Sequence, residues 1–459
     1  MNIQVRSKSW KAIVLGFVAV TLGGFHSTAW SEDVAPPASS DLEQRIRILE
    51  RKLEVSDEAT ATKSKESAKV TAGKEGFQIK SADGDFLLKI RALIQADSRF
   101  FINSTNNSEV DQFLIRRARP ILEGTIYQYA NFLFVPDFAN NGKNVLVDAY
   151  LDIAPWSFIK LRAGKFKSPI GLEHLQSDPN LIFAERGFPS LLVPSRETGV
   201  QLFGDFWQGA LNYAISATNG VGDNNLNTNT TTPVTSDGDV NDSKEGTARL
   251  YAQPFKNTEL ELLQKFGVGF GASYSAQSTT NPTYTTPGQL SLFSVATTAL
   301  ADGEKIRLAP ELNWYYHALG IFGEYVQSSQ VFRVGRVRST IVNDAWQVAA
   351  SYVITGEDAS YSGVKPRKPF DPKNGTWGAF EVAGRFHELY LDPDNFTKGV
   401  TTAAASVQRA TAIGGGINWY LTSALRFTTD YEHTTFDKGA TIGDRPNEDV
   451  VISRWQIYF

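Results

Sequence analysis

Apolar and polar residues alternate along most of the chain after residue 77. The run 85–101 shows this best. One face carries Phe86, Leu88, Ile90, Ala92, Ile94 and Phe100, and the other carries Lys89, Arg91, Gln95, Asp97 and Arg99. Successive side chains of a β-strand point to opposite faces, so the run predicts a strand with one apolar and one polar surface. The last ten residues repeat the pattern and end on Phe459.

Sixteen segments carry this alternation, an even number, as bacterial membrane barrels require. They are 85–101, 112–128, 131–138, 145–154, 158–166, 197–206, 210–218, 247–255, 266–274, 305–316, 319–327, 345–354, 377–387, 411–420, 424–433 and 450–459. The first is long for a strand of a soluble protein and fits a tilted membrane strand. We therefore predict an all-β fold, a 16-stranded antiparallel transmembrane β-barrel over residues 77–459.

The connections between these segments alternate in length. Those after the second, fourth, sixth, tenth and fourteenth segments are tight, and most of the others are long and polar, as short periplasmic turns and long outer loops require. The connection 355–376 is the exception, because it falls where a short turn belongs. It is long and basic, with Lys365, Arg367, Lys368 and Lys373. Two interpretations stay open, a basic exit patch and an ordinary solvated surface.

The N-terminal region differs from the rest. Basic residues, a short apolar run and small residues predict a signal peptide over 1–31. Residues 32–76 are expected to form a periplasmic coiled-coil helix and a linker. Within 41–54, Leu42, Ile46, Leu49 and Leu53 follow the alternating four-and-three spacing of a coiled coil, and a frayed amphipathic helix is the alternative. Residues 59–75 are polar and predict a mobile linker.

Composition excludes several classes of protein. There are no cysteines, the formal net charge is −4, and no later stretch has the roughly 18 apolar residues of a membrane helix. The five histidines are scattered without metal-ligand spacing, and no serine lies in a G-x-S-x-G motif. Gly267–Gly271 lies in a strand segment, and the calcium-loop-like run from Asp237 has alanine at position twelve. We expect no enzyme activity, no cofactor, no bound metal and no nucleic-acid partner.

The connection 167–196 is unusual because it carries many large apolar residues, including Phe183, Phe188 and Leu192. A loop in solvent would not need them. The prediction is that it folds into the lumen and narrows the pore, lined by its polar residues, among them Lys167, Arg186 and Arg196. The alternative is that it caps the barrel from outside or forms an oligomer interface.

Basic residues gather on the polar face of the early strands. The candidates for lining the pore and binding anions are Lys89, Arg91, Arg99, Arg116, Arg117, Arg119, Arg162, Lys165, Lys167, Arg186 and Arg196. Rings of such residues suit anion pores. Arg116 is in the opposite phase to Arg117, so it needs a bulge or an interface partner. The alternative is that these residues pair with lumen carboxylates.

Several motifs resemble the phosphate-selective porin O and P family of Gram-negative outer membranes. They include Ile115-Arg-Arg-Ala-Arg-Pro-Ile-Leu-Glu-Gly124, Gly164-Lys-Phe-Lys-Ser-Pro-Ile-Gly171, Arg196-Glu-Thr-Gly-Val200 and Asn418-Trp-Tyr420. The resemblance covers residues 77–459 and implies an outer-membrane homotrimer with the third loop constricting each pore. At the positions that match the family's motifs, the resemblance implies a pore-lining, anion-binding role for Arg116, Arg117, Lys165, Lys167, Arg186 and Arg196. The ladder of arginines on mid-barrel strands is thin here, with only Arg249 and Arg307.

The function expected is therefore a passive, anion-preferring diffusion channel among outer-membrane lipids, with phosphate or polyphosphate as the solute that the resemblance implies. A general or carbohydrate-type porin is the alternative. Two hypotheses belong to other classes of protein. An outer-membrane lipase is disfavoured, because the sequence contains no nucleophile motif. A structural tether would act through residues 32–75.

Overall fold

The computed structural model describes residues 39–73, 76–102, 109–139, 145–220, 223 and 242–459. The chain divides into two compact units, one ending at Lys65 and the other running from Glu66 to Phe459. The predicted signal peptide over 1–31 lies outside the described residues. No helix in the described part of the chain is long and apolar enough to cross a membrane.

Helix α1 (Ser39–Glu66) is longer than the sequence indicated, because it continues through the first half of the expected linker. The linker prediction is also wrong further on, where Lys69–Gly73 forms strand β1, which pairs with β2 (Gly76–Lys80). The heptad positions of α1 are on its surface, with Leu49 and Leu53 63% and 67% exposed. Whether α1 forms a coiled coil stays a prediction.

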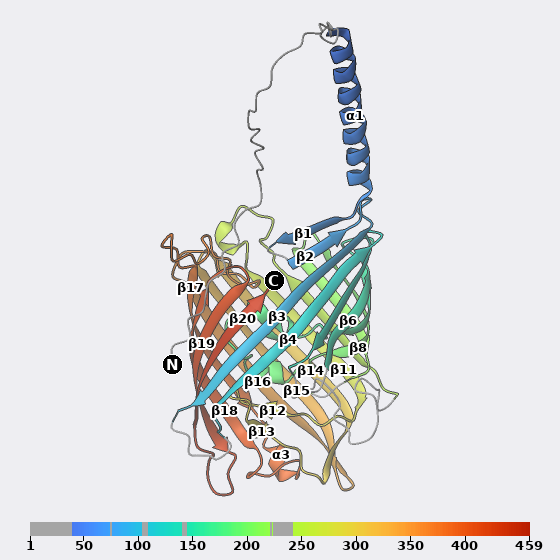
Figure 1. Cartoon of the computed structure of the whole chain (residues 1–459). Helices are drawn as coiled ribbons and strands as arrows, with labels where there is room; N and C mark the ends of the chain where they lie inside the picture. Colours follow the sequence, from blue (N-terminus) through green and yellow to red (C-terminus); the bar gives the residue numbers. More distant parts are fainter. Residues whose placement is uncertain (1–38, 74–75, 103–108, 140–144, 221–222, 224–241) are drawn as a thin grey trace, which may run out of the picture. The chain divides into compact units, whose positions relative to one another are not determined.

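All sixteen predicted strands are present and close into a barrel (Figure 1). They are β3 (Phe86–Phe101), β4 (Gln112–Ile126), β5 (Ala130–Asp137), β6 (Val145–Ile153), β7 (Lys160–Phe166), β8 (Glu197–Phe206), β9 (Leu211–Thr218), β10 (Glu245–Ala252), β11 (Gly267–Ser278), β14 (Ala299–Tyr316), β15 (Leu319–Val334), β16 (Val337–Val353), β17 (Ala379–Tyr390), β18 (Val407–Tyr420), β19 (Leu425–Lys438) and β20 (Glu448–Tyr458). Neighbours pair antiparallel, and β20 pairs with β3 to close the ring. The hairpin β1–β2 extends the sheet by pairing with the start of β3.

The tight connections gather at one end, called here the short-turn end, and the other is the long-loop end. Between β4 and β5, Tyr127 and Gln128 have φ of 50° and 65°, and between β8 and β9, Trp207 and Gln208 have φ of 51° and 57°. Two consecutive residues with positive φ are the mark of type I′ turns, which match the twist of antiparallel strands.

Several strands extend further toward the long-loop end than predicted. β15 and β16 pair as far as Val334 and Val337, so only Gly335 and Arg336 connect them. Arg333 and Arg338, which fall between the predicted strands 319–327 and 345–354, therefore lie on strands, with Arg336 in the turn between them. Phe332 of this extension packs in a buried cluster with Tyr284 and Phe293, which supports the added length.

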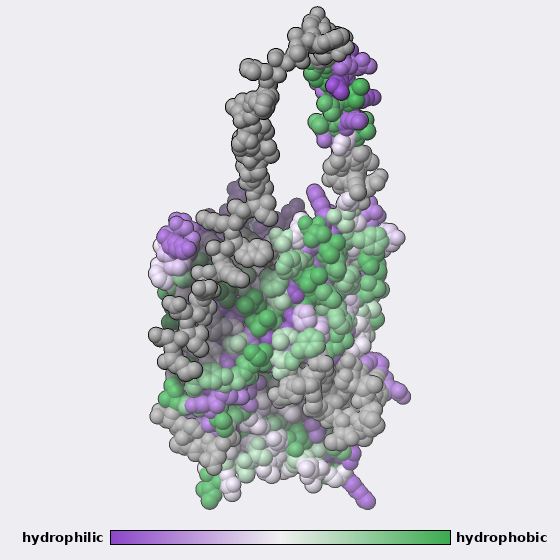
Figure 2. Space-filling view, viewed as in Figure 1, coloured by the Kyte–Doolittle hydropathy of each residue, from purple (hydrophilic) through white to green (hydrophobic). Residues whose placement is uncertain are grey.

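The barrel is polar inside and apolar outside. Ile94, Ile215 and Trp455 are about half exposed on the outer wall, whereas Gln95, Asp97 and Arg454 are buried inside. Figure 2 shows apolar side chains over the outer surface of the strands in view. This distribution is the reverse of a soluble protein and is the one that a lipid-embedded barrel needs.

Three segments outside the barrel strands fill one side of the lumen. They are the loop 167–196 between β7 and β8, the hairpin of β12 (Tyr284–Thr285) and β13 (Ser291–Phe293) from the long-loop end, and the connection 354–378 from the short-turn end. Short helical elements also occur: α2 (Leu172–Leu175), η1 (Asp178–Asn180), η2 (Phe188–Leu191), η3 (Glu261–Leu263) and α3 (Asp394–Thr397).

Candidate functional site

The loop 167–196 lies inside the barrel and is tied to strands on its far side. Arg426 of β19 donates to the carbonyl of Leu181 at 2.5 Å, and Asn418 of β18 donates to that of Ile182 at 2.9 Å. Arg385 of β17 donates to the carbonyl of Glu185 at 2.9 Å. A loop outside the barrel could not make these contacts, so the prediction that the loop lies inside the barrel is confirmed.

The loop has an apolar side and a polar side, and each side meets a different part of the wall. Leu172, Ile182 and Phe183 pack against Phe322 of β15 and Ala349 of β16. Phe188, Leu191, Leu192 and Val193 join a second cluster with residues of β14–β18 and the β12–β13 hairpin. The lumen is therefore closed by packed side chains near β14–β19, and the polar side of the loop faces β3–β8.

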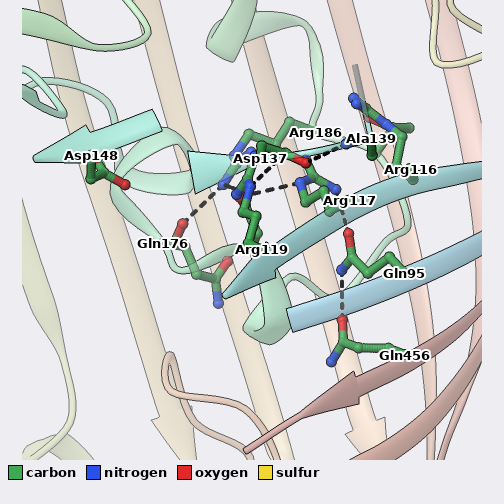
Figure 3. Close-up of polar contacts among 12 residues, drawn as sticks. Gln95, Arg116, Arg117, Arg119, Asp137, Ala139, Asp148, Gln176, Arg186 and Gln456 are labelled. Atoms are coloured by element: carbon green, nitrogen blue, oxygen red, sulfur yellow. Dashed lines mark hydrogen bonds and ion pairs between the residues drawn. The ribbon is translucent and has the colours of Figure 1, made fainter. Parts of the chain in front are cut away.

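Three arginines of β4 meet the polar side of the loop (Figure 3). Gln95 pairs with Arg117 and Ala96 pairs with Ile115, so Arg116 is the extra residue of a β-bulge. The predicted bulge is confirmed. It turns Arg116 to the loop, where its Nε and Nη2 donate to the two carboxylate oxygens of Glu185 at 2.7 and 3.0 Å.

Asp178 is the meeting point of the other arginines. Arg117 Nε lies 3.2 Å from Asp178 Oδ2, Arg186 Nη2 lies 2.6 Å from Oδ1, and Arg119 pairs with both Asp178 and Asp137. Burial by itself raises the pKa of Asp178, but Arg117, Arg186 and Arg119 outweigh burial and hold the pKa well below its usual value. Asp178 therefore stays ionised.

A chain of amides continues from Arg117 across the barrel seam. Arg117 Nη1 donates to Gln95 Oε1 at 2.6 Å, Gln95 Nε2 donates to Gln456 Oε1 at 2.7 Å, and Gln456 Nε2 donates to the carbonyl of Pro179 at 3.0 Å. Figure 3 shows Gln95 and Gln456 aligned below Arg117. This chain of hydrogen bonds ends on the loop at Pro179, so one network holds both the guanidinium of Arg117 and the loop.

The base of the loop carries the remaining charges. Arg196 Nε donates to Asp148 Oδ1 of β6 at 3.1 Å. Lys167 Nζ donates to the carbonyls of His174 and Gln176 at 2.7 and 2.8 Å. Burial lowers the pKa of His174 well below its usual value, and nearby Lys167 and Arg186 lower the pKa further. His174 is therefore neutral and donates from Nε2 to the carbonyl of Ser195.

The charges on the polar side of the loop do not cancel. The space between the loop and the β12–β13 segment is lined by five arginines, Arg116, Arg117, Arg119, Arg186 and Arg196, and by two carboxylates, Asp178 and Glu185. Five minus two leaves a formal charge of +3 in this lining. The expectation that lumen arginines pair with carboxylates is therefore correct, and a positive excess remains.

Two cavities meet at this cluster. One, of about 520 Å³, extends toward the short-turn end and is lined by residues of β3–β10, among them Arg91, Tyr150 and Arg162. The other, of about 130 Å³, lies between the loop and the β12–β13 segment. Arg119, Asp178 and Arg196 line both cavities.

The other predicted residues have mixed positions. Lys89 and Arg91 lie near Glu123 at 3.8 and 3.3 Å, and Arg99 is buried on β3. Arg162 is paired, because its Nε and Nη2 donate to the two carboxylate oxygens of Asp152 at 2.7 and 2.8 Å, while the centre of the Tyr150 ring lies 3.7 Å from its Cζ atom. Its charge is thus largely cancelled where it stands.

Lys165 was expected to line the pore, but it lines neither of the two cavities. Arg162 and Phe166 line the large cavity, so strand alternation places Lys165 on the opposite face of β7, where it is buried and only 5% exposed. Its register partners agree, because Lys165 pairs with Ala149 and Thr198, which alternate with the cavity-lining Asp148 and Tyr150 and with Gln201.

Sequence reasoning missed the residues that hold the loop from the far wall. These are Arg385, Arg426, Arg454 and Asn418. It also missed Tyr361 of the connection 354–378, whose hydroxyl donates to the carbonyl of Leu172 at 2.6 Å. Their alternation marked the strand residues as lumen-facing, but nothing in the sequence indicated which loop they reach. The described residues contain no group of three or more potential metal ligands.

Comparison with known proteins gives one family. The family model described as "Phosphate-selective porin O and P" matches residues 88–459. Porin O of Pseudomonas aeruginosa is 29% identical over 114 residues, which cover 24% of this chain and 25% of Porin O. The match to that curated relative thus spans about a quarter of its length.

Solved structures share the fold. The outer-membrane channel DcaP of Acinetobacter baumannii is 12% identical, with a TM-score of 0.54 over 84% of this chain and 100% of DcaP. OprB of Pseudomonas putida is 10% identical, with a TM-score of 0.50 over 82% of this chain and 95% of OprB. At these identities the likeness concerns the barrel alone.

Proposed function

Since this chain belongs to the phosphate-selective porin O and P family, it is a channel of the Gram-negative outer membrane, and we propose that it conducts small anions in preference to cations. The short-turn end then faces the periplasm. The loop 167–196 is the constriction in this proposal, and Arg119, Asp178 and Arg196 are the side chains that a solute passes.

One observation carries the proposal, the formal excess of three positive charges in the lining of the smaller cavity. In a narrow passage with low-dielectric walls such an excess raises the local concentration of anions. The carboxylates keep the attraction modest, which suits transport, because a solute must bind well enough to enter and weakly enough to leave.

Phosphate is the solute that the family name suggests. Guanidinium groups present fixed pairs of N–H donors that match phosphate oxygens, and Arg119 and Arg196 supply two of them. Each is already engaged, with Asp137 and Asp148, so phosphate would have to compete for these donors. We therefore propose anion preference with weak phosphate binding. Phosphate need not be held as tightly as by a dedicated binding site.

The test is single-channel recording in planar bilayers. Under a potassium chloride gradient, the reversal potential should show chloride preference, and added inorganic phosphate should block the chloride current saturably. Arg119→Gln and Arg196→Gln should each shift the reversal potential toward cations. Arg409→Gln is the matched control, because it removes a positive charge from an exposed arginine that lines neither cavity.

A linear conductance without ion preference would contradict the proposal and favour a general or carbohydrate-type porin. The pairing of nearly every lumen arginine favours that second candidate. A liposome-swelling assay with neutral sugars separates the two, because a general pore admits sugars at rates set by size alone.

We further propose a homotrimer, as the family likeness implies. An outward-facing groove of about 400 Å³ on β3, β4, β19 and β20, lined by Phe113, Ile115, Phe427 and Trp455, would lie against a second copy. Phe113 is 81% exposed in the single chain. Light scattering of the purified protein would measure the mass, and Phe113→Glu should lower it. An unchanged monomeric mass for the native chain would contradict a trimer.

A further inference from the structure

We propose that the outer rim of the barrel carries a binding site for the phosphorylated sugar headgroup of an outer-leaflet glycolipid, built from Arg333 of β15 and Arg338 of β16. The inference rests on the outer-membrane location of the barrel and is independent of its ion preference. It explains a basic cluster that the pore does not use.

The two arginines face outward, away from the lumen. On β15, Ser328, Gln330 and Phe332 are buried inside, so Arg333 lies in the opposite phase. On β16, Arg338 shares its phase with the outward-facing Trp346 and Val348. Arg333 and Arg338 are direct cross-strand partners. Their side chains are 40% and 59% exposed.

A pair of like charges directly opposite one another is unfavourable in a sheet. Here a bulge in β14 relieves the repulsion. Ala301 pairs with Phe332 and Lys305 pairs with Gln330, so Asp302, Gly303 and Glu304 oppose a single residue of β15. This brings Asp302 to both arginines.

Asp302 holds the two guanidinium groups side by side. Arg333 donates to it from Nε, and Arg338 Nη2 lies 3.1 and 3.2 Å from its two carboxylate oxygens. Gln277 of β11 donates to the same carboxylate at 2.7 Å, which fixes its orientation. Bulges that re-aim side chains in this way are functional features more often than defects.

Several donors of the pair remain open. Arg333 uses Nε and, weakly, Nη1, which donates to the carbonyl of Gly335 at 3.3 Å, and Arg338 uses Nη2. Among the described residues none bonds Arg333 Nη2 or the Nε and Nη1 of Arg338. Two adjacent guanidinium edges of this kind match the oxygens of one phosphate group.

The charge at the rim is positive. Arg333, Arg338 and Arg336 of the turn face Asp302 and the exposed, outward Glu304, which leaves a formal charge of +1. Glu304 lies near the hydroxyl of Tyr274 at 3.5 Å. Nearer the membrane, Asp344 of β16 and Glu388 of β17 also face outward, so a phosphate is favoured at the arginine pair and disfavoured below it.

The depth of the pair selects the class of ligand. On the outward face of β16, Val342 lies four positions and Trp346 eight positions from Arg338. Strand rise and a tilt of about 45° place the arginine roughly 10 Å beyond the first of these residues and roughly 20 Å beyond the second. A phosphate directly beside acyl chains would not reach it, whereas phosphates on an extended sugar headgroup would. Lipopolysaccharide is the outer-leaflet lipid with that chemistry.

The experiment is native mass spectrometry of the full-length protein with lipopolysaccharide that keeps a phosphorylated inner core. The native protein should retain bound glycolipid, and the double variant R333Q/R338Q should bind it at least tenfold more weakly. The same lipopolysaccharide with its core phosphates removed should bind the native protein as weakly as the intact lipid binds the variant. Unchanged single-channel conductance would show that the variant is folded.

Arg409→Gln is the matched control, because Arg409 is another exposed arginine, on β18, and it pairs with Asp437 at 3.9 Å. It should leave binding unchanged. Three results would overturn the proposal: equal binding by the double variant, equal loss in Arg409→Gln, or full competition by inorganic phosphate. The last would make the pair a collector of free anions.

Discussion

Asp178 sets the charge of the passage, because Arg117, Arg119 and Arg186 all meet on its carboxylate. Asp178→Asn removes one negative charge without changing the size of the side chain. We expect a larger anion preference, read as a shift of the reversal potential toward that of chloride, since the positive excess in the lining of the smaller cavity grows from three to four.

Asp205→Asn is the control for that experiment, because Asp205 pairs with Lys160 at 3.2 Å and lines neither cavity. It should leave the reversal potential where it is. A shift of equal size in both variants would mean that the overall charge of the barrel matters and that Asp178 has no special place.

His174 predicts a dependence on pH. Burial, with Lys167 and Arg186, keeps its pKa well below the ordinary value of 6.5. When the loop opens and His174 meets water, its pKa returns to about 6.5, so the opened state binds the proton first as the pH falls. The closed loop therefore loses stability below pH 6.5, by up to about 1.4 kcal/mol per pH unit until the lowered pKa is reached.

The measurement is the frequency of current interruptions in single-channel records as the pH is lowered. Interruptions should increase below pH 6.5 in the native channel and should not increase in His174→Gln, which keeps a donor for the carbonyl of Ser195. An identical pH profile in both channels would assign the effect to another group.

At the scale of elements, the connection 354–378 supports the loop 167–196 through hydrogen bonds from the short-turn end. Tyr361 donates to the carbonyl of Leu172, and Gln176 Nε2 donates to the carbonyl of Tyr361 at 2.8 Å. Burial raises the pKa of Tyr361 well above its usual value, so the hydroxyl keeps its proton. Ala359 and Val364 anchor the same connection in a buried cluster.

Tyr361→Phe removes that brace with little change in packing. Losing one hydrogen bond costs about 1 kcal/mol, and the carbonyl of Leu172 keeps the backbone hydrogen bond from Gln176 at 3.2 Å. We expect noisier open-channel current with the mean conductance nearly unchanged. Tyr325→Phe is the control, since Tyr325 lies on β15 in the outward phase. Equal noise in the native channel and Tyr361→Phe would mean that the connection does not brace the loop.

The strands could be predicted from the sequence because alternation is a local signal that lipid outside and polar groups inside both enforce. Arg116 shows how far this reaches: its phase predicted a bulge or an interface partner, and the register shows the bulge. Lys165 shows the limit, since it lies one position from the cavity-lining Phe166 and itself lines neither cavity.

Contacts between distant segments could not be read in this way. Arg454 pairs with Asp97 and Glu185, residues hundreds of positions away, and only the closed ring brings them together. The β12–β13 hairpin was likewise hidden, because its buried Tyr284 and Phe293 are too few to form a periodic pattern.

At the scale of the molecule, the lumen is asymmetric. Packed side chains fill it beside β14–β19, and the open cavity lies beside β3–β10. Arginines of both halves hold the loop, since Arg116 and Arg117 of β4 pair with its carboxylates and arginines of the late strands donate to its carbonyls. In the proposed function, the arginines that meet a solute are those beside the open cavity on the early strands.

The division of the chain into two units predicts where it can be cut. The second unit begins at Glu66 and includes β1, which pairs with β2 and through it with the barrel. A mature chain lacking residues 32–66 should keep its conductance and ion preference, because no barrel strand is lost. Removing 32–75 should in addition lower thermal stability, since β2 then loses the five register pairs of β1. Loss of conductance in the shorter deletion would show that α1 is needed for the pore, and loss of cell-wall attachment alone would give α1 a tethering role.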